Sequence, residues 1–478
     1  MELPTNFSKK IDVLQNYTKE VKRINPSSFD NIKPNGDTVL VYPVLTQDLR
    51  TFFLKFNAET GGDATHMVGF PQYMACLIDT LSLYINGTCV SHIPYYNFIY
   101  KLMKDFSISF EEAVKRVGDN PDPSILTTRT DAGVVTKYNR YTSTGVAGVN
   151  NFSGEYVIDD WIGFLATCEP SIFNVNLVGT MELHIKWADA RVLWGDAGAT
   201  FDYTISSLYG YIDCLDFKDN EYYSAQEKKI ANEGSIEIPF KHYRLQTGTD
   251  TTNGKNSTTR FTESTNSLDK VMFTFFDKDR NTNTNLLLGT PTNVFTTFSS
   301  NLNQLTGDLN YQLQNGYTPA IDFNFECLSA KNDPHLLNTS RYFRRNGLGM
   351  KNATVQFELN SKLNPSFPLT LLGQYEETLK AFELNENNIT NRMNPAIRDL
   401  TRYEKDFYCC ALSTSHINDR RDLSLISGLK TQATSINISV QVVQDSGTHA
   451  NQVGTPVVIT ETTRILKIGA GRMVSVVY

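Results

Sequence analysis

The sequence lacks any run of about 18 apolar residues, the length needed for a membrane-spanning helix. Its start also lacks the basic and then apolar pattern of a secretory signal peptide. Its seven cysteines include no C-x-x-C pair, and several of them fall in apolar, strand-like runs. We therefore expect a protein that is made and folded in a cytosol-like compartment, with reduced and buried cysteines.

Catalytic and cofactor-binding motifs are missing too. The chain has no G-x-S-x-G, no G-x-x-x-x-G-K-[ST] and no H-E-x-x-H motif, and its seven histidines never occur at the spacing of a metal pair. The segment 277–283 has oxygen ligands at alternate positions like a calcium loop, but Leu288 stands where the bidentate glutamate belongs. We therefore predict no catalytic residue, no cofactor, no metal site and no small-molecule substrate.

The composition is that of a folded protein with more than one domain. At 478 residues, the chain exceeds the roughly 250 to 300 residues at which a single hydrophobic core stops growing. Hydrophobic residues make up 40% and charged residues 20%, so two halves can each form a large core. The net charge of -7, with both signs mixed along the chain, argues against a surface dedicated to coating nucleic acid.

Short runs of β-branched and aromatic residues recur from Thr38 onward, whereas helical patterns are few. The run 435–442 alternates polar and apolar residues strictly, as expected for a half-buried antiparallel strand. The three tryptophans, which we expect to anchor a core, all fall late in the first half: Trp161, Trp187 and Trp194. Many short strands with polar loops favour β-sandwiches or jelly rolls over parallel α/β folds.

The strongest turn signal is Asn86-Gly87, which stands between two strand-like runs. This pair supplies the two positive φ angles of a type I′ turn, so a hairpin is predicted here. A two-residue hairpin places Ile85 opposite Thr88 and Leu83 opposite Val90. The buried face of this hairpin is expected to consist of Leu81, Leu83, Ile85 and Val90.

One short charged helix divides the chain. Two strand-like runs, 181–194 and 203–217, are followed by a helical segment at 218–232, and a new strand begins at Ser235. Two further helices are expected in the first half. One covers 95–105, and the other covers 109–117, where a serine stands three residues before a glutamate as in a capping box.

Residues 1–33 are polar and are interpreted as an N-terminal arm. Ile11, Leu14 and Val21 form a weak helical stripe, and Pro26 begins a break after it. The alternatives are a frayed end and an arm that docks on neighbouring chains. In the second case the assembly contacts come from five basic residues: Lys9, Lys10, Lys19, Lys22 and Arg23.

Four segments carry a resemblance to a known family. Residues 183–194 resemble the late strand of the first barrel in the double jelly-roll major capsid proteins of polinton-like viruses, virophages and large DNA viruses. Residues 211–223 resemble the final strand of that barrel as it runs into the linker helix. The segment 92–97, His-Ile-Pro-Tyr-Tyr-Asn, is similar to a strand that leads into a helix in virophage-type capsid proteins, and 407–428 resembles the penultimate region of the second barrel.

The resemblance implies an all-β fold of two consecutive jelly-roll β-barrels, with short helices in loops. It implies four parts: the arm at 1–33, a first jelly roll at 34–217, the linker helix at 218–234 and a second jelly roll at 235–478. The implied function is that of a major capsid protein of an icosahedral double-stranded DNA virus, which is not an enzyme. It would form homotrimers that serve as pseudo-hexagonal capsomers.

The partners that the resemblance implies are other copies of the chain, neighbouring capsomers, penton proteins and minor capsid proteins, with nonspecific contact to packaged DNA. The implied location is the capsid shell of the virion, after synthesis in the host cytoplasm or nucleus.

Two other functions remain open from the residues alone. A carbohydrate-binding β-sandwich, such as a viral spike or lectin, would use aromatic and carboxylate side chains, and Asp159-Asp160 beside Trp161 is the only tight pair of that kind. Adjacent strand residues point to opposite faces, however, so the two carboxylates do not converge without a bulge. This also disfavours a β-rich glycoside hydrolase. The cluster at 341–347, which includes Arg344 and Arg345, is interpreted as either a nucleic-acid contact or a salt-bridge patch between subunits.

Overall fold

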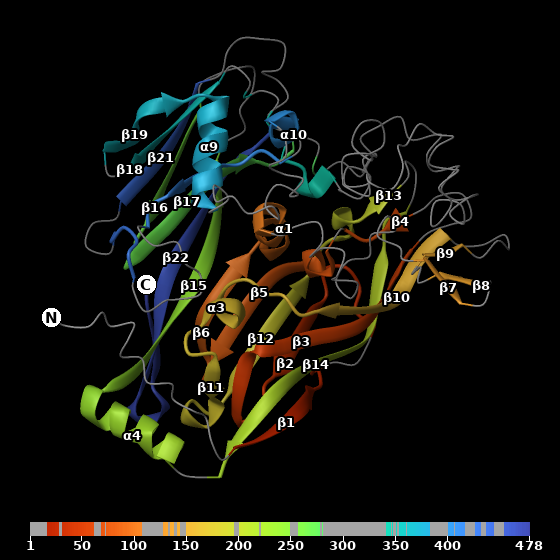
Figure 1. Ribbon diagram of the computed structural model, residues 1–478, viewed down its shortest axis with the longest axis vertical. Coiled ribbons are helices and arrows are strands. Elements are labelled where there is room, and N and C mark those ends of the chain that lie inside the picture. The colour runs from red at the N-terminus through yellow and green to blue at the C-terminus, as the bar shows by residue number, and fades with distance from the viewer. Residues whose placement is uncertain are drawn as a thin grey trace.

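The chain forms two β-rich halves joined by helix α4 (Glu221–Glu233), as Figure 1 shows. The computed structural model describes residues 17–27, 31–61, 68–71, 73–107, 128–131, 134–137, 141–143, 150–195, 200–218, 221–248, 257–277, 280, 341–345, 347, 350, 353–359, 361–382, 400–405, 407–415, 426–431, 436–443 and 454–478. Within these ranges, no helix is both long enough and apolar enough to cross a membrane.

The first half contains two main sheets in which strands distant in sequence pair with one another. The larger sheet runs in the order β1 (Tyr17–Ile24), β14 (Tyr203–Phe217), β3 (Thr46–Thr60), β10 (Asn150–Ile158), β4 (Val68–Gly69) and β13 (Trp194–Gly195), with β11 (Ile172–Asn174) on β3 and β9 (Tyr141–Ser143) on β10. The smaller sheet runs in the order β2 (Asp37–Val41), β12 (Met181–Trp187), β5 (Ile78–Ile85) and β6 (Thr88–Pro94). The early strands β2 and β3 therefore pair with the late strands β12 and β14, as is typical of jelly rolls.

The second half repeats this plan. One sheet runs in the order β15 (Ser235–Thr247), β22 (Pro456–Gly469), β17 (Ser267–Phe275) and β20 (Cys410–Ser413), with β23 (Val474–Val477) on β22. The other sheet runs in the order β16 (Ser257–Glu263), β21 (Ile436–Val443), β18 (Thr354–Leu359) and β19 (Lys362–Leu369). The first strand, β15, pairs with the late strand β22 along its whole length, so this half also closes on itself.

The helices are short and stand between strands. Among the described residues, the α-helices are α1 (Tyr96–Ser107), α3 (Phe164–Thr167), α4, α9 (Leu371–Ala381) and α10 (Leu400–Lys405). A separate hairpin pairs β7 (Thr128–Asp131) with β8 (Val134–Lys137). In Figure 1, α1 stands between the two halves, and α4 lies at the end of the molecule where the chain passes from one half to the other.

The predicted linker helix is confirmed, although α4 begins at Glu221 rather than at residue 218. It is held to the first half by ring stacking of Tyr222 on Phe217, with centroids 4.3 Å apart, and by a hydrogen bond from Asn174 Nδ2 to Gln226 Oε1. Gly234 follows the helix with a φ of 83°, the left-handed conformation that commonly ends helices. The next strand, β15, then begins at once.

The predicted hairpin is confirmed in its turn but was wrong in its register. Asn86 and Gly87 both have positive φ, and Ile85 lies opposite Thr88. Leu83, however, pairs with Ser91 and not with Val90, because a bulge shifts the register between Leu83 and Tyr84. The four predicted core residues of this hairpin are all buried: Leu81, Leu83, Ile85 and Val90.

The expectation of an arm at residues 1–33 was wrong for its later part. Tyr17 to Ile24 form β1, which pairs with β14 over its whole length and so belongs to the first barrel. Ile24 is buried, and Ile32 exchanges backbone hydrogen bonds with Ile205. The weak helical stripe misled because pairing with the edge of β14 satisfies the backbone groups of this segment better than an isolated, marginal helix would.

The core contains Trp161 and Trp187, as predicted, and the side chain of the third predicted anchor, Trp194, is not among those described. Trp161 donates to the backbone oxygen of Phe52 at 3.0 Å, and Trp187 donates to Thr38 Oγ1 at 2.9 Å. The described cysteines are free, and all but Cys89 are buried. Burial raises the pKa of Cys168 and of Cys409 to about 12, which keeps these thiols protonated and unreactive.

Several predictions fall on residues outside these ranges. They include the helix at 109–117 and most of the calcium-like segment 277–283.

Candidate assembly unit and the contact between the barrels

Hydrogen bonds join α3 of the first half and the residues just after it to β15 of the second half. The N–H of Glu169 donates to the oxygen of Pro239 at 3.1 Å, and the N–H of Lys241 donates to Thr167 Oγ1 at 2.8 Å. Between these bonds, the rings of Phe164 and Phe240 meet edge to face with centroids 5.0 Å apart. The first strand of the second barrel is therefore fixed on the first barrel.

A buried arginine joins aromatic side chains from both halves. The Arg280 guanidinium lies 3.6 Å from the ring centre of Phe276 and 3.8 Å from that of Tyr342, both in the second half. From the first half, Phe98 of α1 packs on Phe276 with centroids 4.8 Å apart, and Tyr95 lies 5.6 Å from the guanidinium. Burial lowers the pKa of Arg280, but stacking on the electron-rich ring faces favours its charged form.

An ion-paired triad lies deeper in the same contact. Arg345 Nη2 of the second half is 2.7 Å from Asp105 Oδ2 at the end of α1, and Lys101 pairs with the other oxygen of this carboxylate. All three side chains are at least 96% buried. Beside them, the rings of Phe106 and Phe382 stack across the two halves at 4.8 Å. Because a buried charge without its partner is costly, this triad ties the position of α1 to that of the second half.

A histidine lies at the contact between the smaller sheet of the first half and β15. Ser91 Oγ and His242 Nδ1 are 3.2 Å apart, and the neighbouring His92 bonds to Ser82 at 2.8 Å. Burial lowers the pKa of His242 well below its ordinary value, and the positive charges of Arg464, His92 and Arg244 add to the effect. His242 is therefore neutral in the joined barrels.

The structure places three of the five predicted assembly residues on β1, where each contacts its own chain. Lys19 pairs with Asp213 of β14, Lys22 pairs with Glu20, and the Arg23 guanidinium lies 4.2 Å from the ring centre of Tyr209. Lys9 and Lys10 lie outside the described residues. The structure does not test an assembly role for these five residues, but it shows that Lys19 and Arg23 contact β14, whereas Lys22 contacts its own strand.

Two other predicted candidates are engaged within the chain. Asp160 pairs with Lys104, while Trp161 is buried, so this pair presents no aromatic and carboxylate sugar site. Of the arginines at 344 and 345, the first lies 3.7 Å from Asp277 and the second pairs with Asp105. The interpretation was a salt-bridge patch between subunits, whereas both of these pairs form within one chain. Across the described ranges, no group of three or more His, Cys, Asp or Glu side chains is placed to hold a metal ion.

Sequence reasoning missed the residues that hold the barrels together. Asp105 and Arg345 are 240 positions apart, and nothing in the local pattern around either residue names the other. The one signal available in the sequence was the run of apolar residues in α1. In the structure this helix is buried on nearly every side, as expected for a helix enclosed between two units.

Comparisons with known proteins agree with this architecture. No family model matches the chain, and no curated protein matches it in sequence. In structure, the chain is similar to the Faustovirus major capsid protein with a TM-score of 0.55 and 8% identity, over 96% of this chain and 91% of that chain. It is also similar to a chain of the PBCV-1 virus capsid, with a TM-score of 0.54 and 11% identity, over 99% of both chains. The chain has the double jelly-roll fold.

A third similarity is to the PBCV-1 protein that was fitted into a reconstruction of the virophage Sputnik, with a TM-score of 0.55 and 10% identity over 99% of both chains. The fold predicted from the sequence is thus confirmed. The double jelly roll of this chain includes both pairs of sheets and the linker α4.

Proposed function

We propose that this double jelly-roll chain is a major capsid protein of an icosahedral double-stranded DNA virus, with a structural rather than a catalytic role. The observation that carries the proposal is the length of the similarity to viral capsid chains, which extends over nearly all of this chain and of each neighbour. Both barrels and their junction therefore follow one architecture, and no additional described unit is left to supply another activity.

The proposed building block is a homotrimer. A ring of three chains uses one kind of interface three times and closes, so that six barrels form a pseudo-hexagonal capsomer. The contact between the barrels supports this, because a chain whose two barrels are joined by buried aromatic and ionic contacts can act as one rigid part of such a ring. The proposed domains are a first barrel that starts at β1 and ends at Phe217, a linker at 218–234 and a second barrel at 235–478.

We propose the capsid shell as the location and neighbouring capsomers, penton proteins and minor capsid proteins as partners. Because Lys19, Lys22 and Arg23 belong to β1, the assembly role foreseen for the basic residues falls mainly to Lys9 and Lys10, which precede it. Contacts of these two lysines with acidic subunits or with packaged DNA would weaken as the salt concentration rises.

Light scattering of the purified protein, with and without reductant, tests the trimer. The proposal expects about three times the chain mass of 53.9 kDa in both conditions, since the described cysteines are free. A monomer, or a trimer that reductant dissociates, would contradict it. The alternative of a carbohydrate-binding protein is not favoured, because its one candidate site is engaged in the core and in an ion pair.

A further inference from the structure

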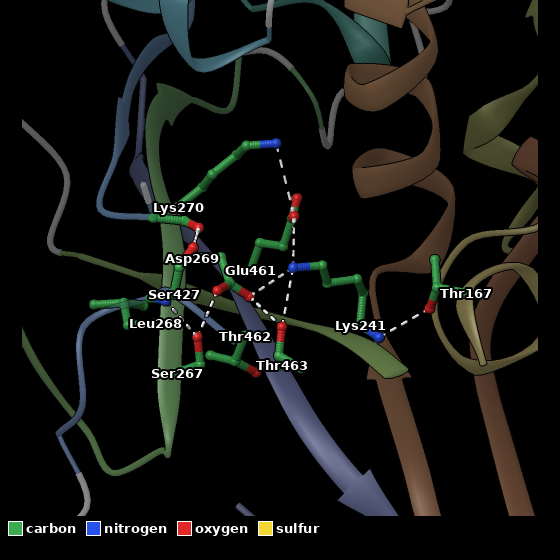
Figure 2. A network of polar contacts seen from close by, with 12 residues as sticks. Thr167, Lys241, Ser267, Leu268, Asp269, Lys270, Ser427, Glu461, Thr462 and Thr463 are labelled. Carbon is green, nitrogen blue, oxygen red and sulfur yellow. Dashed lines mark hydrogen bonds and ion pairs between the residues drawn. The ribbon is translucent and has the colours of Figure 1, made fainter. Parts of the chain in front are cut away.

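Four charged side chains are buried together in one sheet of the second barrel. Lys241 of β15, Asp269 and Lys270 of β17, and Glu461 of β22 are each at most 7% exposed. Lys241 Nζ lies 3.0 Å from Asp269 Oδ2 and 4.0 Å from Glu461 Oε1, and Lys270 Nζ lies 3.7 Å from the same Glu461 oxygen. Figure 2 shows Lys241, Asp269 and Glu461 pointing toward one another from three neighbouring strands.

The strand register explains how they meet. β22 lies between β15 and β17, and Thr463 of β22 is opposite Lys241 on one side and Ser267 on the other. A bulge between Leu268 and Lys270 shifts the register of β17 at Asp269, so that this carboxylate lies beside the Ser267 hydroxyl and over Thr463. The long side chain of Lys241 reaches across β22 to it.

The Asp269 carboxylate is held in a fixed position by hydroxyl donors. Ser267 Oγ donates to Oδ1 at 2.6 Å, and Thr463 Oγ1 donates to Oδ2 at 2.7 Å. Gly428 closes over this group, since its N–H donates to Ser267 Oγ at 3.0 Å, and a Cβ at this position would collide with both Ser267 and Asp269. The carboxylate is thus oriented, shielded and supplied with donors for negative charge that develops on its oxygens.

We propose that Lys241 and Asp269 condense to form an isopeptide bond between Nζ and Cγ. In the first step one proton moves from the Lys241 ammonium to Asp269 Oδ2, 3.0 Å away, which gives a neutral amine beside a neutral acid. The amine lone pair then attacks Cγ. The hydroxyl of Ser267 stabilises the oxyanion that forms at Oδ1, and Oδ2, the oxygen nearest Lys241 Nζ, becomes the departing hydroxyl. Contact within a packed core replaces an unfavourable encounter in solution.

Glu461 is the base in this reaction. Its carboxylate accepts the second proton from Lys241 Nζ and passes it to the departing hydroxyl of Asp269, which leaves as water. One N–C bond forms, one C–O bond breaks, and one water is released, so no oxidant or other reactant is needed. Lys270 remains the counter-ion of Glu461, and the cluster is left with one positive and one negative charge.

Another buried lysine and carboxylate pair of the described residues, Lys101 and Asp105, does not meet the same conditions. Asp105 is bound by Lys101 and also by Arg345, so a second cation holds the carboxylate oxygen where Asp269 has a hydroxyl donor. The second pair is therefore a control within the same protein. The proposal expects an isopeptide bond between Lys241 and Asp269 and none between Lys101 and Asp105.

The bond would fasten β15 to β17 across β22. It would hold three strands of one sheet in register after folding. Because the N–H of Lys241 also donates to Thr167, the cross-link lies at the point where the second barrel is attached to the first. Such a bond suits a shell subunit that must resist force and dilution, because disulfides do not form in a reducing compartment.

Mass spectrometry of the denatured full-length protein tests the proposal. The expected mass is one water below that of the sequence, and a tryptic digest should contain peptides 230–244 and 261–270 as one linked species, uncut at Lys241. The variant Glu461→Gln, which keeps the size of the side chain but removes the base, should show the unmodified mass.

Three results would overturn it. One is wild-type protein at the full sequence mass. Another is a mass one water short with peptides 230–244 and 261–270 found separately, because the water would then have been lost elsewhere. The third is a linked Glu461→Gln variant, which would remove Glu461 from the reaction. The wild-type measurement decides the main question even if the variant does not fold.

Discussion

Arg345 and Asp105 form an ion pair with 2.7 Å between Nη2 and Oδ2, although one belongs to the second half of the chain and the other ends α1 in the first. Both side chains are almost fully buried, and Lys101 contacts the same carboxylate. The ion pair couples the two barrels. Without the Asp105 carboxylate, the buried charges of Lys101 and Arg345 would have neither a counter-ion nor water while the barrels stay joined.

Asp105→Asn is expected to lower the stability of the chain by about 3 to 5 kcal/mol, since it leaves two buried cations without a counter-charge. Arg345→Met should cost less, because Asp105 keeps Lys101 as its partner. Urea unfolding followed by tryptophan fluorescence measures both. The matched control is Lys229→Gln, which removes an exposed pair with Glu233 in α4 and should change stability by less than about 1 kcal/mol. An Asp105→Asn variant as stable as this control would contradict the importance given to the triad.

The contact at His242 predicts that acid loosens the joined barrels. The pKa of His242 is lowered in the folded chain, so the unfolded chain takes up a proton first as the pH falls below about 6.5. Stability that is fully present above this pH is then lost as the pH falls toward the folded-state value, by up to about 1.4 kcal/mol per pH unit.

Unfolding measured across this pH range should show a smaller slope in His242→Asn than in the wild type. Ser91→Ala is the matched control: it removes the hydrogen bond but keeps the titrating ring, so it should lower stability and retain the slope. Equal slopes in the wild type and in His242→Asn would show that other groups cause the acid sensitivity.

Two truncations distinguish the contribution of residues 1–16 from that of strand β1. Removing residues 1–16 should leave the melting temperature unchanged, because β1 and its pairing with β14 are kept. Removing residues 1–26 should lower it, since the buried Ile24 is lost and β14 becomes an open edge that can aggregate. Differential scanning calorimetry of both truncated forms gives the comparison. If both melt like the full chain, β1 contributes nothing to the first barrel.

The same truncations address assembly. The form without residues 1–16 should make trimers but close shells poorly at low salt, because it lacks Lys9 and Lys10. Equal shell formation by this form and the full chain across a salt series would assign these lysines no role.

Local signals in the sequence were enough for the outline of the fold. Asn86-Gly87 predicted its turn because positive φ is a property of the two residues themselves. The linker α4 was predicted because a short charged run at 218–232 stood between two strand-like runs.

The features that could not be predicted depend on residues that are distant in the sequence. The bulge at Leu83 and Tyr84 arises from how β5 fits β6 and β12 together, so the local alternation does not show it. Lys19 and Arg23 looked like free charges until β14 placed Asp213 and Tyr209 beside them. The cluster around Lys241 needs three strands from both ends of the second half, which no short pattern can join.

Negative-stain electron microscopy of the purified protein tests the central claim most directly. The account predicts particles of one size with a pseudo-hexagonal outline, in which six barrels from three chains surround a threefold axis. Two-lobed particles of the size of one chain, at concentrations where the protein is stable, would contradict it.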